Sequence, residues 1–195
     1  FSQCDISNNI GMFFVGESGS NPSFTDCNFI NNGPLYLEQS PFIFTNCNFI
    51  STGLFVSLEN VNSPNTDLTN CSFTEGASIY CIWYSGGGYR PLKLTNCTFD
   101  NATGSFADKP PCAIYNDGAK LILTSCTFTN NPIAIYTTGE GNPTINLESC
   151  FFSDNYGEYG GAIRADTGRW TIRNCSFEEN VSSNRGGAIA FSFCD

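Results

Sequence analysis

The nine residues FIFTNCNFI, Phe42–Ile50, contain the pattern that decides the fold, because close copies of it recur along the whole chain. Each copy is centred on a cysteine, and successive copies lie 20 to 29 residues apart. An apolar residue always lies two positions after the cysteine, and another lies three positions before it. A repeat of this length indicates a solenoid, in which each copy forms one coil. The cysteines of the series are Cys4, Cys27, Cys47, Cys71, Cys97, Cys126, Cys150 and Cys175.

The alternation of apolar residues predicts two strands in each copy. Alternate side chains of a strand point to one face, so Cys47 and Phe49 point the same way. Phe44 alternates with the apolar residue two places before it, but its parity differs from that of Cys47, so it belongs to a separate strand. We expect a two-residue corner at Thr45 and Asn46, because Asn tolerates the left-handed backbone that such a bend needs. Both strands can then face one core.

A third apolar segment follows in later copies, for example Ala113–Tyr115 and Ala134–Tyr136. Three short strands per copy, with Asn or Gly at the corners, predict an all-β fold: a parallel β-helix, or β-solenoid, of about eight turns of about 24 residues. Equivalent residues would stack about 4.8 Å apart. Helices are not expected, because no window has apolar residues at three- and four-residue spacing. We expect residues 1–195 to form a single domain.

Two further motifs resemble those of known families. Phe-x-x-Asn recurs at Phe29–Asn32, Phe128–Asn131, Phe152–Asn155 and Phe177–Asn180, and Gly-Gly-Ala-Ile occurs at Gly160–Ile163 and Gly186–Ile189. Together they resemble the repeats of the chlamydial polymorphic membrane proteins, which are surface adhesins with a β-helical passenger, and more broadly the pectin-lyase-type right-handed β-helices. The resemblance covers nearly the whole chain. It implies a right-handed coil. It is specific for the fold and says little about activity, because the matching residues are those that form the coil.

Composition excludes several classes of function. The chain of 195 residues has 18 acidic and 8 basic side chains, a net charge of -10 and no block of like charges. This balance argues against nucleic acid or an anionic membrane as a partner. No apolar run approaches the roughly 20 residues needed to cross a bilayer, so we do not expect this segment to insert into a membrane. Because Phe1 already lies inside a repeat, we expect a mature chain or a fragment whose targeting information lies elsewhere.

The eleven cysteines are interpreted in two groups. An odd number leaves at least one thiol unpaired within the chain. The cysteines of the series face the core, where we expect free thiols packed as small hydrophobic groups. Cys81, Cys112 and Cys194 lie outside the series and are the better candidates for a disulfide, with Cys81 and Cys112, on adjacent coils, as the candidate pair. Neither a metal nor another cofactor is expected, because the sequence has no Cys-x-x-Cys and no histidine.

Five Asn-x-Ser/Thr sequons suggest the secretory route and an extracellular or cell-surface location. Asn101 lies in a lengthened loop, Asp100–Pro111, and is the preferred candidate for a glycan. Asn180 ranks second, at a Phe-x-x-Asn corner. The other three are corner residues whose side chains we expect to bond along the stack: Asn70, Asn96 and Asn174.

No catalytic residues are predicted. β-Helical lyases and hydrolases of acidic polysaccharides use clustered aspartates with arginine, lysine or histidine, and glycoside hydrolysis needs two carboxylates. The only acidic residues in loosely equivalent positions are Asp100 with Asp154 or Glu178. The string Asn65–Asp67 is similar to one polygalacturonase motif, but the elements that should follow it are missing. We therefore expect that the protein is not an enzyme.

An aromatic group suggests a binding surface. Trp83, Tyr84 and Tyr89 flank a glycine-rich loop, and such rings suit sugar stacking or contact with a partner protein, although alternate rings could instead fill the coil. Neither end reads as a cap, so copies could stack end to end. The leading hypothesis is a non-catalytic extracellular structural or adhesive module that self-associates into a filament and contacts glycans or a host or matrix surface. The alternative is a carbohydrate-active β-helix, either polysaccharide-binding or lyase- or hydrolase-like.

Overall fold

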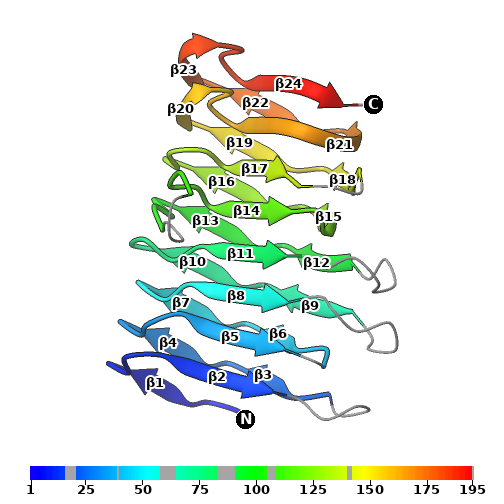
Figure 1. The fold of residues 1–195 in the computed structure, drawn as a ribbon. Coiled ribbons are helices and arrows are strands. Elements are labelled where there is room, and N and C mark those ends of the chain that lie inside the picture. The colour runs from blue at the N-terminus through cyan, green and yellow to red at the C-terminus, as the bar shows by residue number, and fades with distance from the viewer. Residues whose placement is uncertain are drawn as a thin grey trace.

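The computed structural model describes residues 1–15, 21–38, 40–57, 65–82, 91–104, 109–139 and 142–194. Within these ranges the regular elements are all β-strands. They wind into a rod of stacked coils with the chain termini at opposite ends, as Figure 1 shows. The predicted fold class, an all-β parallel solenoid, is therefore confirmed. No helix among these residues is long and apolar enough to cross a membrane.

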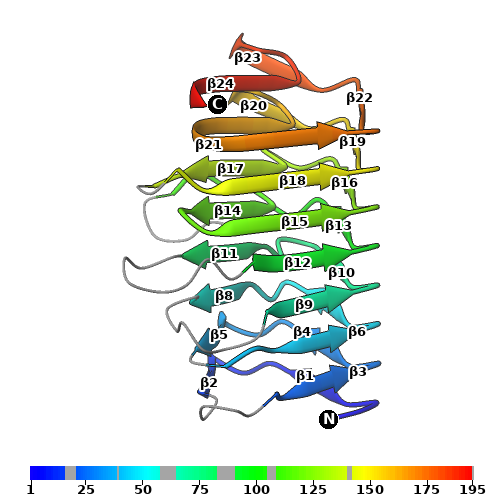
Figure 2. The ribbon, with the colours of Figure 1, turned by 90° about the vertical axis from the view of Figure 1, so that its right-hand side faces the viewer.

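Each coil contributes strands to three faces, which we name sheets A, B and C. Sheet B has eight parallel strands, one per coil, in the spatial order of the sequence. Figure 2, turned by 90°, shows the strands of sheet A stacked above one another. Sheet B consists of β1 (Asp5–Ser7), β4 (Asn28–Ile30), β7 (Asn48–Ile50), β10 (Ser72–Thr74), β13 (Thr98–Asp100), β16 (Thr127–Thr129), β19 (Phe151–Ser153) and β22 (Ser176–Glu178).

Sheets A and C join through one long strand, β21 (Ile163–Arg173), which pairs with both. Sheet A contains β3 (Ser23–Thr25), β6 (Ile43–Thr45), β9 (Thr66–Thr69), β12 (Pro91–Thr95), β15 (Lys120–Thr124) and β18 (Thr144–Glu148). Sheet C contains β2 (Met12–Val15), β5 (Leu35–Glu38), β8 (Leu54–Ser57), β11 (Ile79–Ile82), β14 (Ile114–Asp117), β17 (Ile135–Thr138) and β24 (Ile189–Cys194). A separate pair, β20 (Tyr156–Tyr159) and β23 (Val181–Arg185), lies at the C-terminal end.

The core consists of columns of identical side chains. The phenylalanines of sheet B stack with ring centroids 4.6 to 4.9 Å apart from Phe29 to Phe177. The cysteines stack beside them: the amides after Cys71 and Cys97, on Ser72 and Thr98, bond to the carbonyls of the cysteines one coil earlier at 3.0 and 2.9 Å. This confirms the stacking predicted from the repeat. The interior cysteines, from Cys27 to Cys150, are fully buried.

The corner between sheets A and B lies one residue later than expected. β6 ends at Thr45 and β7 begins at Asn48, so Asn46 and Cys47 separate the two strands, and Asn46 has the left-handed φ of 54°. Equivalent residues in the other coils, including Asn70 and Asn96, have φ values of 52° to 55°. Their exposed amides form a ladder, in which Asn70 Nδ2 donates to Asn46 Oδ1 at 3.0 Å and Asn96 Nδ2 donates to Asn70 Oδ1 at 2.9 Å.

The Asn of each Phe-x-x-Asn motif forms a second, internal ladder between sheets B and C. Asn155 is fully buried. Its Nδ2 donates to Asn180 Oδ1 at 2.8 Å and to the carbonyl of Phe128 at 3.0 Å. Its Oδ1 accepts from the backbone amide and from Nδ2 of Asn131. These bonds satisfy backbone groups at a corner where no sheet partner is available. The motif therefore has a structural role.

The Gly-Gly-Ala-Ile motif is explained by a close approach of backbone atoms. Gly160 has φ 62° and Gly186 has φ 65°, in the left-handed region. A Cβ atom added at Gly160 would collide with the carbonyl of Ile163, and one added at Gly186 would collide with that of Ile189. Only glycine fits both conditions without strain.

The candidate disulfide between Cys81 and Cys112 is not formed, because the register does not bring the two residues together. Both thiols are free, and Asn116 lies opposite Cys81 in the neighbouring strand. The thiol of Cys81 faces the core and donates to Oδ1 of Asn116 at 3.3 Å. Cys112 packs instead into a separate cluster with Tyr115. Burial raises the pKa of the Cys112 thiol to about 12.

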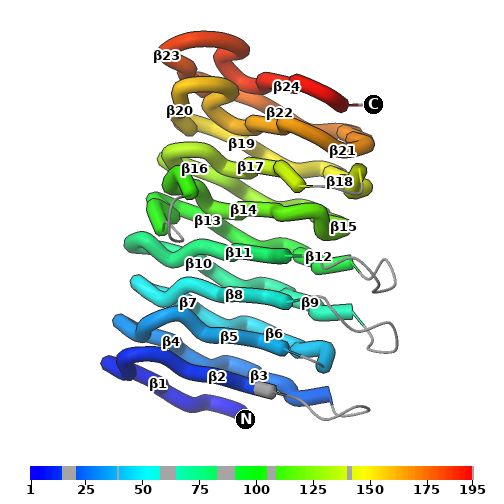
Figure 3. The backbone as a smooth tube through the Cα atoms, viewed as in Figure 1, coloured from blue at the N-terminus to red at the C-terminus, as the bar shows by residue number. Residues whose placement is uncertain are grey.

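The two end coils of the described rod differ from the interior ones, because each is paired on one side only. Six coils lie between them, and Figure 3 traces the backbone through the stack. Phe1 is 70% exposed at one end, and Phe193 is 88% exposed at the other. Apolar side chains and strand edges are therefore accessible at both ends of the coil.

Candidate functional site

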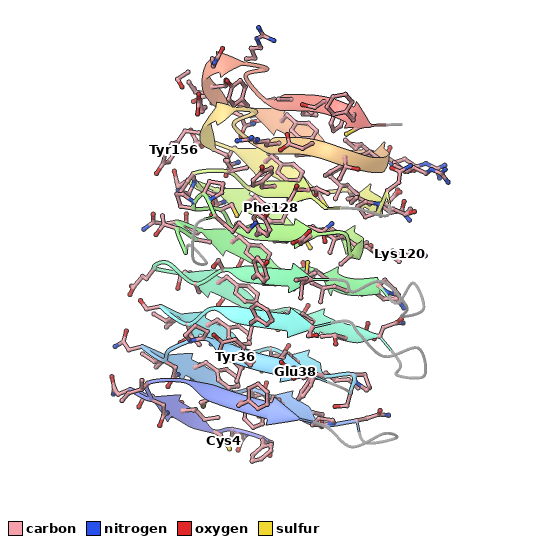
Figure 4. All side chains as sticks on the ribbon, in the orientation of Figure 1. Cys4, Tyr36, Glu38, Lys120, Phe128 and Tyr156 are labelled. Atoms are coloured by element: carbon pink, nitrogen blue, oxygen red, sulfur yellow. The ribbon has the colours of Figure 1, made fainter. Side chains whose placement is uncertain are left out.

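An outward-facing column of aromatic rings runs along sheet C. Its members alternate with the core residues of their strands, so they point away from the interior. The register pairs each ring with the next one along the rod. Neighbouring ring centroids lie 4.9 to 5.9 Å apart. We call this set the aromatic column; it consists of Phe13, Tyr36, Phe55, Tyr80, Tyr115 and Tyr136, and Tyr36 is labelled in Figure 4.

Exposure changes along the aromatic column. Phe13 is 58% exposed, Tyr36 and Phe55 are half-buried, and Tyr115 is 2% exposed. Cys112 and Ile133 pack against the buried tyrosines and form a second apolar cluster outside the core. Burial raises the pKa values of Tyr115 and Tyr136 far above the usual range of a phenol, so both remain neutral at physiological pH. The N-terminal half of the column thus offers accessible ring faces, and the C-terminal half is covered.

Arg164 follows Tyr136 in the same column and ends it with a cation. Its guanidinium carbon lies 4.5 Å from the ring centroid of Tyr136 and 5.3 Å from that of Tyr159. Asp166 accepts a hydrogen bond from the Tyr136 hydroxyl at 2.7 Å and lies 3.4 Å from the guanidinium. Two rings and one carboxylate therefore fix the position of this guanidinium; Asp166 offsets part of its charge, whereas the cation–π contacts do not.

Two pockets meet at Arg164. One, of about 490 Å³, is polar and contains a second cation, Arg185, beside Tyr159 and Asp166. The other, of about 440 Å³, is mainly apolar, and its lining includes Pro110, Pro111, Pro132, Ile133, Tyr156 and Val181. Tyr156 is 54% exposed in the apolar pocket. The combination of accessible rings with fixed cations suits a ligand that has both an apolar face and an anionic group.

The residues predicted as sites from the sequence do not gather here. Trp83, Tyr84 and Tyr89 lie outside the described residues. The sequons lie on three coils: Asn70 on one, Asn96 and Asn101 on a second, and Asn174 and Asn180 on a third. Asn70, Asn96 and Asn174 are corner residues, as expected, and their side chains are exposed. Asn180 belongs to the internal ladder, where its Nδ2 donates to the carbonyl of Phe152 at 3.0 Å. Asn101 is exposed, and no hydrogen bond joins its side chain to another described residue.

The aromatic column was missed in the sequence. Its signal is an aliphatic residue followed by a ring at the start of the sheet C segment, as in Leu35-Tyr36, Leu54-Phe55, Ile79-Tyr80, Ile114-Tyr115 and Ile135-Tyr136. Because both the even and the odd positions of these strands are apolar, the sequence does not tell which set of side chains faces inward. Only the structure, which places the aliphatic residues in the core, shows that the rings face outward.

Asp100 and Glu178, two of the acidic residues considered for catalysis, lie too far apart for glycoside hydrolysis. Asp100 and Glu178 share a column on sheet B, but Thr129 and Ser153 occupy the two coils between them. Three coil spacings amount to about 14 Å at about 4.8 Å each, beyond the roughly 5 to 9.5 Å that glycoside hydrolysis uses. Among the described residues, no group of three or more His, Cys, Asp or Glu side chains is placed to hold a metal ion.

These features define a parallel β-solenoid with an aromatic outer face. Residues 80–192, more than half of the chain, match the family model described as the right handed beta helix region. The chain therefore belongs to the right-handed β-helix family. No curated protein matches the chain, and no solved structure matches it either.

Proposed function

We propose that this protein is a non-catalytic structural and adhesive rod that reaches the extracellular space or cell surface by the secretory route. The observation that carries the proposal is the aromatic column. Solvent-accessible rings in register on a rigid scaffold are expensive to expose and mark a contact surface. The resemblance of the repeats to those of surface adhesins supports the same interpretation.

The interior supports a role that requires stiffness. The phenylalanines stack with planes only 2° to 6° from parallel between Phe29 and Phe177. The Asn ladders fix the corners of successive coils on both sides of sheet B. Close-packed interiors resist deformation, so such a coil can present an outer surface at a defined distance and orientation.

The site near Arg164 favours binding over chemistry. Oδ2 of its carboxylate, Asp166, accepts a hydrogen bond from the Tyr136 hydroxyl and also contacts the guanidinium. Asp166 thus acts as a fixed support for Arg164, and the site presents a positioned cation beside ring faces.

A binding experiment tests the adhesive function. The triple variant Phe13→Ser, Tyr36→Ser, Phe55→Ser removes the accessible half of the aromatic column, while Ile43→Ser with Ile122→Ser alters outward residues of sheet A as a control. Immobilised matrix glycoproteins and cultured animal cells serve as probes. We expect the triple variant to lose at least about tenfold in bound protein and the control to bind like wild type. Equal binding by all three proteins would refute the role of the column.

We also propose that copies stack end to end. Each end coil presents strand edges and exposed apolar groups, a ready template for another coil. Net charge does not favour this contact: residues 1–89 contain seven acidic and no basic side chains, and residues 142–195 contain seven acidic side chains beside Arg164, Arg169, Arg173 and Arg185. Two net-negative ends repel each other at low salt, so the apolar groups and strand edges must supply the attraction.

Sedimentation velocity and negative-stain microscopy test the stacking. The purified chain should form short rods at high salt, and these should shorten as the salt concentration falls, because less screening strengthens the repulsion between the acidic ends. Monodisperse single particles at high protein concentration and high salt would refute the stacking and leave the adhesive function standing.

A second function, carbohydrate binding, is favoured by the two pockets at Arg164. Tyr156 can stack on a sugar ring in the apolar pocket, while Arg164 and Arg185 face an acidic substituent in the polar one. Arg164→Gln should abolish retention on an acidic polysaccharide, and Arg173→Gln, in sheet A, should not. Formation of unsaturated or reducing ends during the incubation would show that the protein is an enzyme.

A further inference from the structure

We infer that Asn101-Ala102-Thr103 is the one sequon of this chain that carries an N-linked glycan. The inference rests on the proposed passage through the secretory route. All five sequons satisfy the Asn-x-Ser/Thr rule. The structure distinguishes them by the hydrogen bonds that the Asn side-chain amide and the Ser or Thr hydroxyl already make.

In the four other sequons, the Asn side-chain amide is a hydrogen-bond donor within the stack. The two in sheet A corners donate to the corner residue one coil earlier, and Asn174 does the same to a glutamate. The amide of Asn180 points inward to a backbone carbonyl and also accepts from Asn155. Because the next coil lies only about 4.8 Å away, a sugar on any of these nitrogens would crowd its neighbour. The distances from Nδ2 are 3.0 Å for Asn70 to Asn46, 2.9 Å for Asn96 to Asn70, 3.0 Å for Asn174 to Glu148 and 3.0 Å for Asn180 to Phe152.

The hydroxyl groups of the sequons give a second, independent distinction. Ser72 donates to Asn48 at 2.7 Å, and Ser176 donates to Glu178 at 3.0 Å. Ser182 donates to the carbonyls of Glu158 and Arg185. Only Thr98 and Thr103 have hydroxyls without a hydrogen bond within the described part of the chain.

Asn101-Ala102-Thr103 is therefore the sequon in which both groups are available. Asn101 has φ 52°, and its backbone is held by bonds to the coils on both sides: its amide donates to Thr129, and its carbonyl accepts from Gly76. Ala102 is buried, and its amide donates to Asn131 Oδ1 at 2.9 Å. Asn101 and Thr103 are exposed on either side of this anchor. A fixed backbone thus presents both side chains to solvent.

The chemistry needs a donor of one class, an oligosaccharide linked to a lipid through diphosphate. Nδ2 of Asn101 attacks C1 of the first sugar, so that the nitrogen–carbon bond forms while the bond from C1 to the diphosphate oxygen breaks. The lipid diphosphate leaves with the bonding electrons, and the amide loses one proton. Attachment leaves the backbone bonds of Asn101 and Ala102 intact, because they do not involve the side-chain amide.

Secretion from animal cells tests the inference. The chain, fused to a cleavable leader, is purified from the medium and examined by intact mass and by glycopeptide mapping. We expect one glycan, on Asn101. Asn101→Gln and Thr103→Ala should each give the unglycosylated mass, and Thr103→Ser should restore the glycan. Asn96→Gln is the matched control, and it should keep one glycan.

Each other result has a defined meaning. A bare Asn101 in secreted protein with the circular dichroism of β-structure, or a glycan on one of the ladder asparagines, overturns the inference and leaves the proposed function intact. Retention and degradation of the wild-type chain inside the cells would count against the secretory route itself. The binding tests above use unglycosylated protein from bacteria, so their outcome is independent of this one.

Discussion

Gly160 illustrates how a single position can determine whether a coil closes. Its left-handed φ costs a residue with a side chain about 1–2 kcal/mol, and the added Cβ would also collide with the carbonyl of Ile163. We therefore expect Gly160→Ala to lower the free energy of unfolding by more than about 2 kcal/mol, measured by urea denaturation.

Gly187 supplies the control for this substitution. Its φ is not positive, and a Cβ there meets only the carbonyl of Asn180 at 3.5 Å, an ordinary contact. Gly187→Ala should therefore change stability by less than about 0.5 kcal/mol. Similar losses in the two variants would show that the glycine motif is not required for the backbone approach described here.

Asp67 is a destabilising residue on the outer face of sheet A. Burial raises the pKa of its carboxyl, an effect that Lys93 opposes in part, and its Oδ1 atom has no hydrogen-bond partner. A raised native pKa means that the folded state binds the proton more tightly than the unfolded chain. The stability contributed by this group is thus greatest below the unfolded pKa of about 3.9 and is lost as the pH rises through the native value.

Asp67→Asn removes the loss of stability that accompanies ionisation of this carboxyl. At pH 7 the variant should be more stable than wild type by up to about 1 kcal/mol, a small gain because the group is partly exposed. The difference should vanish as the pH falls below about 4. Thermal unfolding followed by circular dichroism measures both, with Asp154→Asn, at an exposed corner, as the control. A variant less stable than wild type at pH 7 would show that the attraction of Lys93 exceeds the cost of burial.

The internal Asn ladder holds strands of sheets B and C together at their shared corner. Asn155→Ala would leave the backbone amide of Asn131 and one of its two Nδ2 hydrogens without partners in a buried site, and it would remove a hydrogen bond from the carbonyl of Phe128. Each unsatisfied group costs about 1–3 kcal/mol, so we expect a loss of at least about 3 kcal/mol in the free energy of unfolding.

Asn96→Gly is the matched change in the exposed ladder, because glycine keeps the left-handed corner and removes only a solvent-exposed side chain. It should cost less than about 1 kcal/mol. Equal losses in the two variants would mean that burial does not distinguish the ladders, contrary to the geometry.

The strands differ in how well the sequence predicts them. In most strands of sheets A and B a polar residue separates the apolar ones, as Asn48 separates Cys47 from Phe49, so parity alone places such residues in the core. In sheet C, Ile79, Tyr80 and Cys81 are all hydrophobic, so periodicity does not predict whether the ring of Tyr80 points into the core or away from it. The position of the corner was not predictable to the residue either, because a corner at Asn46 and Cys47 differs from one at Thr45 and Asn46 only in hydrogen bonding.

The candidate site was less predictable than the fold. Arg164 and Tyr136 lie 28 positions apart, and Arg185 comes from the following coil. Coil lengths that vary from 20 to 29 residues hide such pairs until the register is known. The Cys81 to Cys112 bridge failed for the same reason: the longer loop shifts Asn116, and not Cys112, opposite Cys81.

The whole rod is a row of units that contact only their neighbours. In such solenoids stability is the sum of the units and their interfaces, so a coil paired on one side should open more readily than one paired on both. We expect amide hydrogen exchange to be slowest in β10, β13 and β16 and fastest in β1 and β22. Uniform protection from end to end would instead show that the rod unfolds as one cooperative block.

The phenylalanine column has one more consequence, for how such a chain can change its length. Phe49 contacts Phe73 in the same parallel geometry in which Phe73 contacts Phe99. If the segment bearing Phe73 were deleted, Phe49 and Phe99 would meet as equivalent partners, and nothing else in the interior would need redesign. Ancestors and relatives of this molecule can therefore gain or lose whole repeats, each altering its reach by about 4.8 Å, while both termini keep their form.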